Sequence, residues 1–272
     1  MDLNEIKTAC ITGATSGIGA AFAKEFAKQG YDLIITGRRK EKIEFLSNTL
    51  SKEYNVNIEV IIAELSDNKN LDLLIDTIKR TKNLEILVNN AGFAIENVFY
   101  DEDFSSHEAM LKVHNFALIK LCHTVLPDMV SRGKGKIINV SSLGAFIPLP
   151  LNAVYSASKS FIKLFSESIH FELQGTGVKV QALCPGMTRT DFHEKMGYDK
   201  NTYYKDKGLE KAMTAEEVVE ISLKDLEKNK VLCIPGRHKK IFSFLLKVLP
   251  RAVIYKIVSS KFEKGKIESS SL

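Results

Sequence analysis

Residues 8–19 read TACITGATSGIG, and this stretch decides the fold class. An apolar strand pattern runs into a turn that holds Gly13, Gly17 and Gly19, and a helical pattern follows from residue 17 to 29. A strand, a glycine-rich turn and a helix in this order present backbone N–H groups to a phosphate. Gly13 would allow the tight exit from the strand, Gly17 the approach of backbone to a pyrophosphate, and Gly19 close packing of helix on strand.

The glycine turn has a second interpretation. Its spacing differs from GxGxxG, so a tight turn without a ligand is the alternative. Thr15 and Ser16 could add hydroxyl donors for a phosphate. Motifs elsewhere in the chain have to decide between a nucleotide site and a turn that binds no ligand.

Apolar runs alternate with longer amphipathic runs along most of the chain. The predicted strands are residues 8–12, 31–37, 57–63, 84–90, 135–142, 178–185 and 231–235. The predicted helices are residues 17–29, 39–53, 68–80, about 103–131, 153–174 and 215–228. Most of the strands are nearly continuous in Ile, Val and Leu, which suits a parallel sheet buried on both faces. We therefore predict an α/β fold in three layers, doubly wound around a mostly parallel sheet of about seven strands.

Composition and charge exclude several classes of protein. The chain has 272 residues and 44% hydrophobic content, enough for a large core. Its net charge of +5 and its pI of about 8.8 are too mildly basic to indicate nucleic-acid binding. The four cysteines form no CxxC pair, so we expect reduced thiols, no metal site and a cytoplasmic protein. We find neither a secretory signal nor an apolar run of about 18 residues that would span a membrane.

The second predicted strand ends in ITGRRKEK, and its arginines bear on the choice of nucleotide. In NAD-binding units an acid about 20 residues after the glycines binds the ribose hydroxyls. Here that zone holds Arg38 and Arg39 and no acid. An arginine suits a 2′-phosphate, so the sequence predicts NADP(H) rather than NAD(H). The alternative is that both arginines are solvated residues at the start of a helix.

Five motifs follow one another along the chain. They are TGATSGIG at 12–19, NNAG at 89–92, Ser142 at a strand end, YSASK at 155–159 and PGMTRT at 185–190. In this order and spacing they closely resemble the short-chain dehydrogenase/reductase family, over residues from about 7 to 235. The resemblance implies a Rossmann fold, a nicotinamide cofactor and catalysis by a serine, a tyrosine and a lysine.

The resemblance also implies a role for each catalytic position. Tyr155 would be the acid in carbonyl reduction and the base in alcohol oxidation, and Ser142 would hold the substrate oxygen. Lys159 would bind the nicotinamide ribose and lower the pKa of Tyr155. Lowering is needed because a free phenol, with a pKa near 10, is a poor base near neutrality. Residues four apart share a helix face, and a nearby ammonium favours the phenolate.

The implied cofactor contacts follow the same motifs. Asn90, Ala91 and Gly92 would line the adenosine side, and residues from 185 to 190 would border the nicotinamide. The full set of implied contacts is Gly13, Thr15, Ser16, Gly17, Ile18, Gly19, Arg38, Arg39, Glu64, Leu65, Asn90, Ala91, Gly92, Tyr155, Lys159, Pro185, Gly186, Thr188 and Thr190.

Two positions depart from the family's pattern. Relatives usually carry an Asn in the fourth helix, where this chain reads MLKVHNFALIKL. The register places His114 there, and a histidine could replace the Asn as a proton-relay element. A shift of one residue would give the position to Asn115, and a histidine merely bonded inside the helix is the third interpretation. Many relatives carry Asp where Glu64 stands, so Glu64 is assigned to the adenine by resemblance alone.

Two segments fall outside the strand–helix alternation. Residues 187–213 are polar, aromatic and irregular, and we predict a loop that covers the substrate. A long surface excursion and a dimer contact are the alternatives. Residues 237–266 combine bases with apolar residues and are split at Pro250. We predict a catalytic domain at 1–236, with that loop inserted, and a basic amphipathic extension at 237–272. The extension would pack on the domain or a partner subunit, or lie on an anionic membrane surface.

The sequence therefore predicts an NADP(H)-dependent oxidoreductase that interconverts a carbonyl and a secondary alcohol by hydride transfer. Its partners would be a small-molecule substrate and further copies of the chain, as a homodimer or homotetramer. The alternative is a sensor or scaffold that binds NADP(H) without turnover. Ser142, Tyr155 and Lys159 are all present, which favours the enzyme.

Overall fold

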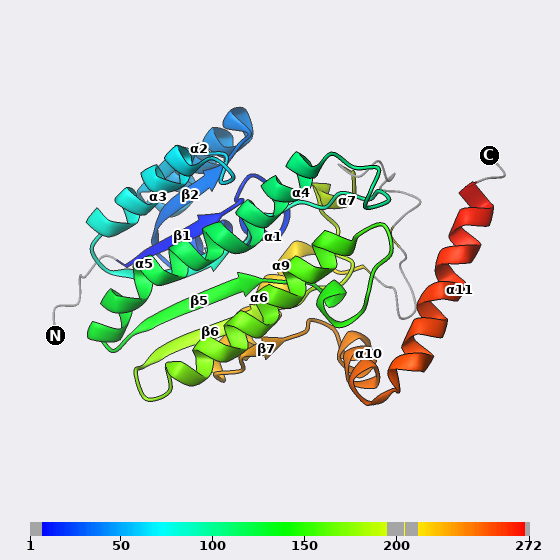
Figure 1. Ribbon diagram of the computed structural model, residues 1–272. Helices are drawn as coiled ribbons and strands as arrows, with labels where there is room; N and C mark the ends of the chain where they lie inside the picture. The colour runs from blue at the N-terminus through cyan, green and yellow to red at the C-terminus, as the bar shows by residue number, and fades with distance from the viewer. Residues whose placement is uncertain (1–6, 195–203, 205–211, 270–272) are drawn as a thin grey trace.

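A seven-stranded parallel sheet forms the centre of the computed structural model, which describes residues 7–194, 204 and 212–269 (Figure 1). The strand order is β3-β2-β1-β4-β5-β6-β7. The strands are β1 (Thr8–Thr12), β2 (Asp32–Gly37), β3 (Ile58–Ile62), β4 (Leu84–Asn89), β5 (Gly135–Val140), β6 (Val178–Leu183) and β7 (Leu232–Cys233). The predicted α/β class and strand number are thereby confirmed.

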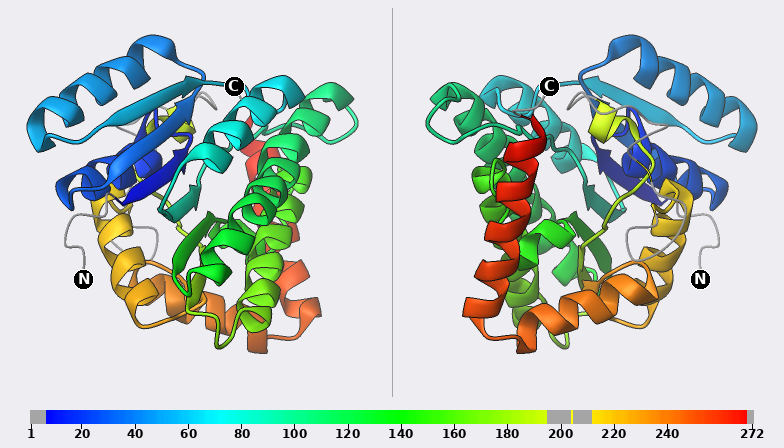
Figure 2. Two further views of the ribbon diagram at one scale, coloured as in Figure 1. Left: turned by 90° about the vertical axis from the view of Figure 1, so that its left-hand side faces the viewer. Right: turned by 90° about the vertical axis from the view of Figure 1, so that its right-hand side faces the viewer.

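Helices cover both faces of the sheet, which makes three layers (Figure 2). On one face, α1 (Gly17–Lys28), α2 (Lys40–Tyr54) and α9 (Ala215–Glu227) share a hydrophobic core with the strands. On the other face, α3 (Asn68–Arg80), α5 (Ala117–Ser131) and α6 (Ala153–Glu172) share a second core. Both faces of the central strands are buried, which explains their nearly continuous apolar sequence.

The predicted helix at 103–131 is interrupted, which corrects that prediction. It consists of α4 (Phe104–Leu111), a π-helical turn η1 (Lys112–Phe116) and α5. A π turn holds one residue more than an α turn and is common at functional sites. Here it carries His114 and Asn115, whose side chains both bond to Ser158 on α6. The apolar periodicity continues through such a turn, so the sequence pattern did not reveal it.

The chain after β6 is tied back to the domain at several points. Short helix α7 (Asp191–Glu194) follows a bridge between Thr188 and Met213, so the two ends of the 187–213 segment lie side by side. The predicted covering loop itself falls largely on residues 195–203 and 205–211, outside the described residues. The C-terminal extension forms α10 (Arg237–Val248) and α11 (Arg251–Ser269), separated at Pro250. None of the helices in the described ranges is long and apolar enough to cross a membrane.

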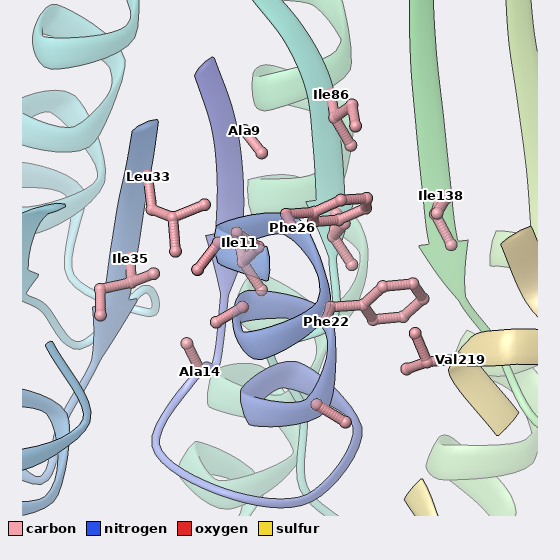
Figure 3. Packing of buried hydrophobic residues seen from close by; sticks show 14 of the residues in the cluster. Ala9, Ile11, Ala14, Phe22, Phe26, Leu33, Ile35, Ile86, Ile138 and Val219 are labelled. Carbon is pink, nitrogen blue, oxygen red and sulfur yellow. The ribbon is translucent and has the colours of Figure 1, made fainter. Parts of the chain in front are cut away.

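Phe22 and Phe26 pack α1 against the strands of the sheet (Figure 3). Their rings stack with centroids 5.8 Å apart, and both side chains are almost completely buried. The first helix therefore carries the glycine turn on a rigid support.

Replacing Phe22 tests this support. We expect Phe22→Ala to lower the free energy of unfolding by about 3–5 kcal/mol, because it removes buried area and leaves a cavity. Urea unfolding followed by circular dichroism measures it. The matched control is Phe45→Ala on α2, where the side chain is 74% exposed and should change stability by less than about 0.5 kcal/mol. Equal losses in both variants would contradict this packing.

Candidate active site

A cleft of about 780 Å³ lies at the carboxyl ends of the strands. It includes the ends of β1 and β4, the neighbours at which the strand order reverses, where ligands bind in open α/β sheets. Of the residues predicted for catalysis or cofactor binding, only Gly19 and His114 do not line it. Lining residues that the sequence did not single out include Thr36, Ala63, Ala94, Glu96, Val113, Leu149, Pro150 and Asn152.

The glycine turn has the conformation that the sequence suggested. Gly13 and Gly17 have φ angles of +69° and +57°, which favour glycine. A Cβ on Gly13 would lie 2.8 Å from the Ala91 Cα, so backbone fills that space. The Asn90 side chain donates to the carbonyls of Thr12 and Gly13, each at 3.0 Å. Asn90 thus lines the cleft as predicted, but its amide holds the turn.

Two adjacent serines follow β5 and do different things. The Ser142 Oγ accepts a hydrogen bond from Gly144 N at 3.0 Å and caps the short helix η2 (Leu143–Phe146) at the edge of the cleft. The Ser141 Oγ instead donates to the Lys159 carbonyl at 2.7 Å in the interior. Ser142 is therefore the serine whose hydroxyl can meet a substrate, and Ser141 fixes the helix that carries the lysine.

Tyr155 and Lys159 lie in the first turns of α6. The Lys159 Nζ donates to the Val140 carbonyl at 3.0 Å and lies 5.7 Å from the centroid of the Tyr155 ring. Burial lowers the pKa of Lys159 to about 8. Burial also raises the pKa of Tyr155, against an opposing effect of its hydrogen bond to Ser142. Burial thus has the largest effect on the pKa of Tyr155, and the Lys159 ammonium is directed to the Val140 carbonyl. The lowering of the Tyr155 pKa by Lys159 stays a prediction.

His114 lies behind the cleft with both ring nitrogens bonded. Its Nε2 accepts from Phe93 N at 3.1 Å, so the proton is on Nδ1, which donates to the Ser158 Oγ at 2.8 Å. Ser158 in turn donates to the Tyr155 carbonyl at 2.7 Å. Asn115 donates to the Ser158 carbonyl at 3.2 Å. This geometry makes His114 a positioning residue for the active-site helix, and the proton relay stays a hypothesis.

The two arginines after β2 have different surroundings. Arg39 donates to the hydroxyls of Thr15 and Ser16 at 2.7 and 2.6 Å and pairs with Asp191 of α7 at 2.9 Å. Lys42 reaches the same carboxylate at 3.2 Å. Burial raises the pKa of Asp191, but the bonds from Arg39 and Lys42 outweigh it and leave the pKa below its ordinary value. Asp191 and Lys42 are the members of this cluster that the sequence did not single out.

Arg38 has other partners in the cleft. It pairs with Glu64 at 2.9 Å and lies over the Phe93 ring at 5.9 Å. Arg38, Glu64 and residues 90–92 of the NNAG motif all line the cleft, and their contacts with a cofactor stay a prediction.

The PGMTRT segment forms the far end of the cleft. The Pro185 carbonyl accepts from Leu143 N at 2.9 Å, which ties the segment to the loop after Ser142. The Tyr204 hydroxyl donates to the Thr190 carbonyl at 3.0 Å. Lys239 of α10 donates to the Met187 carbonyl at 3.2 Å. Thr188 and Thr190 line the cleft between these anchors.

The fold and this cleft define a dinucleotide-binding protein of the doubly wound α/β class. Residues 7–201 match the family described as short chain dehydrogenase. The chain therefore belongs to the short-chain dehydrogenase/reductase family of oxidoreductases.

Individual relatives agree with the family. Very-long-chain 3-oxoacyl-CoA reductase of Anas platyrhynchos is 34% identical over 200 residues, covering 71% of this chain and 64% of that protein. Sulfoacetaldehyde reductase 2 of Chromohalobacter salexigens is 36% identical over 185 residues, covering 67% and 73%. A short-chain dehydrogenase from Sphingobium yanoikuyae, solved with NADPH, superposes with a TM-score of 0.79 at 30% identity, covering 90% and 96%. The first match spans less than two thirds of the duck protein's length.

The buried His114 predicts a pH dependence of stability. Burial and the neighbouring Lys159 lower its pKa well below the ordinary 6.5. Below pH 6.5 this histidine binds a proton in the unfolded chain but stays neutral in the folded chain. The free energy of unfolding therefore falls as the pH drops below 6.5, by at most about 1.4 kcal/mol per pH unit for this group.

Urea unfolding between about pH 5 and 7 measures this slope. We expect His114→Asn to have a shallower slope than the unchanged protein over that range. His123→Asn on the exposed side of α5 is the matched control and should keep the slope. Equal slopes in all three proteins would show that His114 takes up a proton in the folded state.

Proposed function

We propose that the protein is an NADP(H)-dependent oxidoreductase that interconverts a carbonyl and a secondary alcohol by hydride transfer. The observation that carries the proposal is the meeting of Ser142, Tyr155 and Lys159 in one cleft with the glycine turn. Either feature alone has a structural explanation. Together they support a proton donor and an oxygen-binding hydroxyl beside a dinucleotide site.

The residues present fit a nicotinamide dinucleotide. The positive φ angles of Gly13 and Gly17 open the turn, and α1 starts at that turn with its free N–H groups. Residues of the glycine turn would hold the cofactor's phosphates. Glu64 and the NNAG motif would hold the adenine side, and the PGMTRT segment would border the nicotinamide. The cofactor supplies the hydride when bound, and the protein supplies position and a proton.

Each catalytic side chain then has a defined task. Ser142 donates a hydrogen bond to the carbonyl oxygen, on which negative charge develops as the carbonyl carbon is reduced. Tyr155 passes its phenolic proton to that oxygen. The phenol of Tyr155 is protonated near neutrality, so it carries the proton that carbonyl reduction needs. Lys159 supplies a buried ammonium beside the phenol.

Arg39 supports the preference for NADP(H). Its guanidinium donates to the Thr15 and Ser16 hydroxyls of the glycine turn, and its counter-ion is the Asp191 carboxylate. A 2′-phosphate is a stronger bidentate partner for arginine than one carboxylate oxygen. The relative from Sphingobium yanoikuyae was solved with NADPH, which agrees with this assignment.

The walls around Tyr155 favour an apolar carbonyl substrate. Phe192 lies 6.1 Å from the Tyr155 ring, and other apolar side chains line the same cleft. They include Leu143, Leu149 and Met187. We propose a ketone or aldehyde with an apolar body as the substrate.

Self-association is the other part of the proposal. Large apolar side chains are exposed along η1, α5 and α6, where a second copy could cover them. They are Phe116, Ile119, Phe161, Leu164 and Phe171. A homodimer through these helices agrees with the resemblance.

Replacing Tyr155 tests the chemistry. We expect Tyr155→Phe to lower kcat for NADPH oxidation by about a thousandfold or more on any active substrate from a ketone and aldehyde panel, since the proton donor is lost. NADPH affinity, followed by nicotinamide fluorescence, should change little. A variant that turns over at the unchanged rate would refute the role of Tyr155. NADPH binding by the unchanged protein without turnover across the panel would favour the sensor or scaffold.

Replacing Arg39 tests the cofactor preference. We expect Arg39→Ala to weaken NADPH binding by about 10- to 100-fold while NADH binding stays within about twofold, since only NADPH carries the 2′-phosphate. Calorimetry with both cofactors measures the two dissociation constants. Arg80→Ala on α3 is the matched control, because Arg80 is exposed and does not line the cleft. Equal weakening of NADPH and NADH binding would show that Arg39 does not recognise the 2′-phosphate.

Asp191 gives an independent test of the same site. Its carboxylate competes with a phosphate for Arg39, so Asp191→Asn should tighten NADPH binding several-fold and leave NADH binding nearly unchanged. Weaker NADPH binding in this variant would mean that Asp191 supports the bound cofactor rather than competing with it.

A further inference from the structure

Helix α10 is inverted relative to an ordinary surface helix. Its inward residues are Lys239 and Ser243, which are 7% and 4% exposed. Its outward residues are large and apolar, with Phe244 at 62% and Val248 at 58% exposed. A helix that merely packs on a domain buries its apolar side and exposes its charges. The apolar side of α10 is therefore not used by the domain.

The outward residues of α10 form a continuous apolar face. Ile241, Leu245 and Val248 follow the spacing of one helix side, and Phe244 and Phe242 flank them. On α11, Val253 and Ile257 lie four residues apart on one side of the helix and are both more than 40% exposed. We name these exposed residues of α10 and α11 the C-terminal apolar face. Both helices lie at the outer edge of the molecule: α10 is next to β7, and α11 runs past the carboxyl ends of the strands (Figures 1 and 2).

The segment that carries this face also carries the positive charge of the protein. Residues 237–272 contain nine Lys or Arg and two acids, a net charge of +7, and residues 237–262 contain no acid. Residues 1–236 contain 29 Lys or Arg and 31 acids, a net charge of −2, which together give the +5 of the chain. Arg251 and Lys256 are exposed beside the apolar face.

We propose that the C-terminal apolar face binds the surface of an anionic lipid bilayer. Aromatic and aliphatic side chains that enter the headgroup boundary, next to bases that meet acidic lipids, are the features of helices that lie on a membrane. The α10 and α11 helices would lie on the surface, since neither can cross it. A second copy is a poorer partner, because two symmetry-related tails would bring bases without acids together.

The inner side of α10 connects this surface to the cleft. Lys239 donates to the Met187 carbonyl, and α10 contacts η2, the helix that Ser142 caps. A Cβ on Gly186 would lie 2.8 Å from the Lys239 side chain, so the helix fits closely against the PGMTRT segment. A bilayer on the outer side of α10 would therefore lie next to the substrate end of the cleft.

Vesicle binding by the full-length protein tests the proposal without any need for activity. The protein is sedimented with vesicles of phosphatidylcholine alone and with vesicles that contain phosphatidylserine as well. We expect binding to the anionic vesicles that weakens as salt rises, and little binding to the neutral ones. Two double variants, Phe244→Ser with Leu245→Ser and Arg251→Glu with Lys256→Glu, should each reduce binding about tenfold or more.

The matched controls carry the same changes elsewhere on the surface. They are Phe45→Ser and the pair Lys28→Glu with Lys52→Glu, all at exposed positions. Thermal melting establishes that every variant is folded. Absence of binding by the unchanged protein, or equal binding by variants and controls, would overturn the proposal. So would self-association that both double variants abolish, with no vesicle binding, since a second copy would then be the partner.

Discussion

The bonds between β4 and the glycine turn are the interaction on which the site depends. The Thr12 hydroxyl accepts hydrogen bonds from Asn90 N and Ala91 N, each at 3.0 Å, and donates to the Val88 carbonyl. The Asn90 amide reaches back to the Thr12 and Gly13 carbonyls. These bonds join the ends of β1 and β4, the neighbouring strands at which the strand order reverses. They fix the conformation of the glycine turn without a ligand.

Burial sets the electrostatics of the cleft more than pairing does. It lowers the pKa of Lys159 and raises that of Tyr155, so both groups are driven toward their neutral forms by the same cause. His114 completes this group as a neutral ring, held by Phe93 N and Ser158. The charge of a ligand would act strongly on the ionisable groups of such a buried site, because water does not screen it there.

The sequence was sufficient for the features that depend on neighbouring residues. Apolar runs placed the strands to within about two residues at nearly every end, and the motif spacing placed Ser142, Tyr155 and Lys159 in one cleft. Features that depend on distant partners were missed. The pairing of Arg39 with Asp191 joins residues 152 apart, and the π turn carries His114, whose ring bonds to Phe93 N and to Ser158 of α6. The inversion of α10 also required knowing which side of the helix faces the domain.

The glycine of the NNAG motif has a consequence for how this chain can change in evolution. A Cβ on Gly92 would lie 2.8 Å from the His114 Nε2 and 3.4 Å from the Lys159 Nζ. Positions 92, 114 and 159 therefore share one small volume, although each lies on a different element. A larger side chain at one of these positions needs a smaller one at another. Substitutions at the three positions should therefore covary among related sequences.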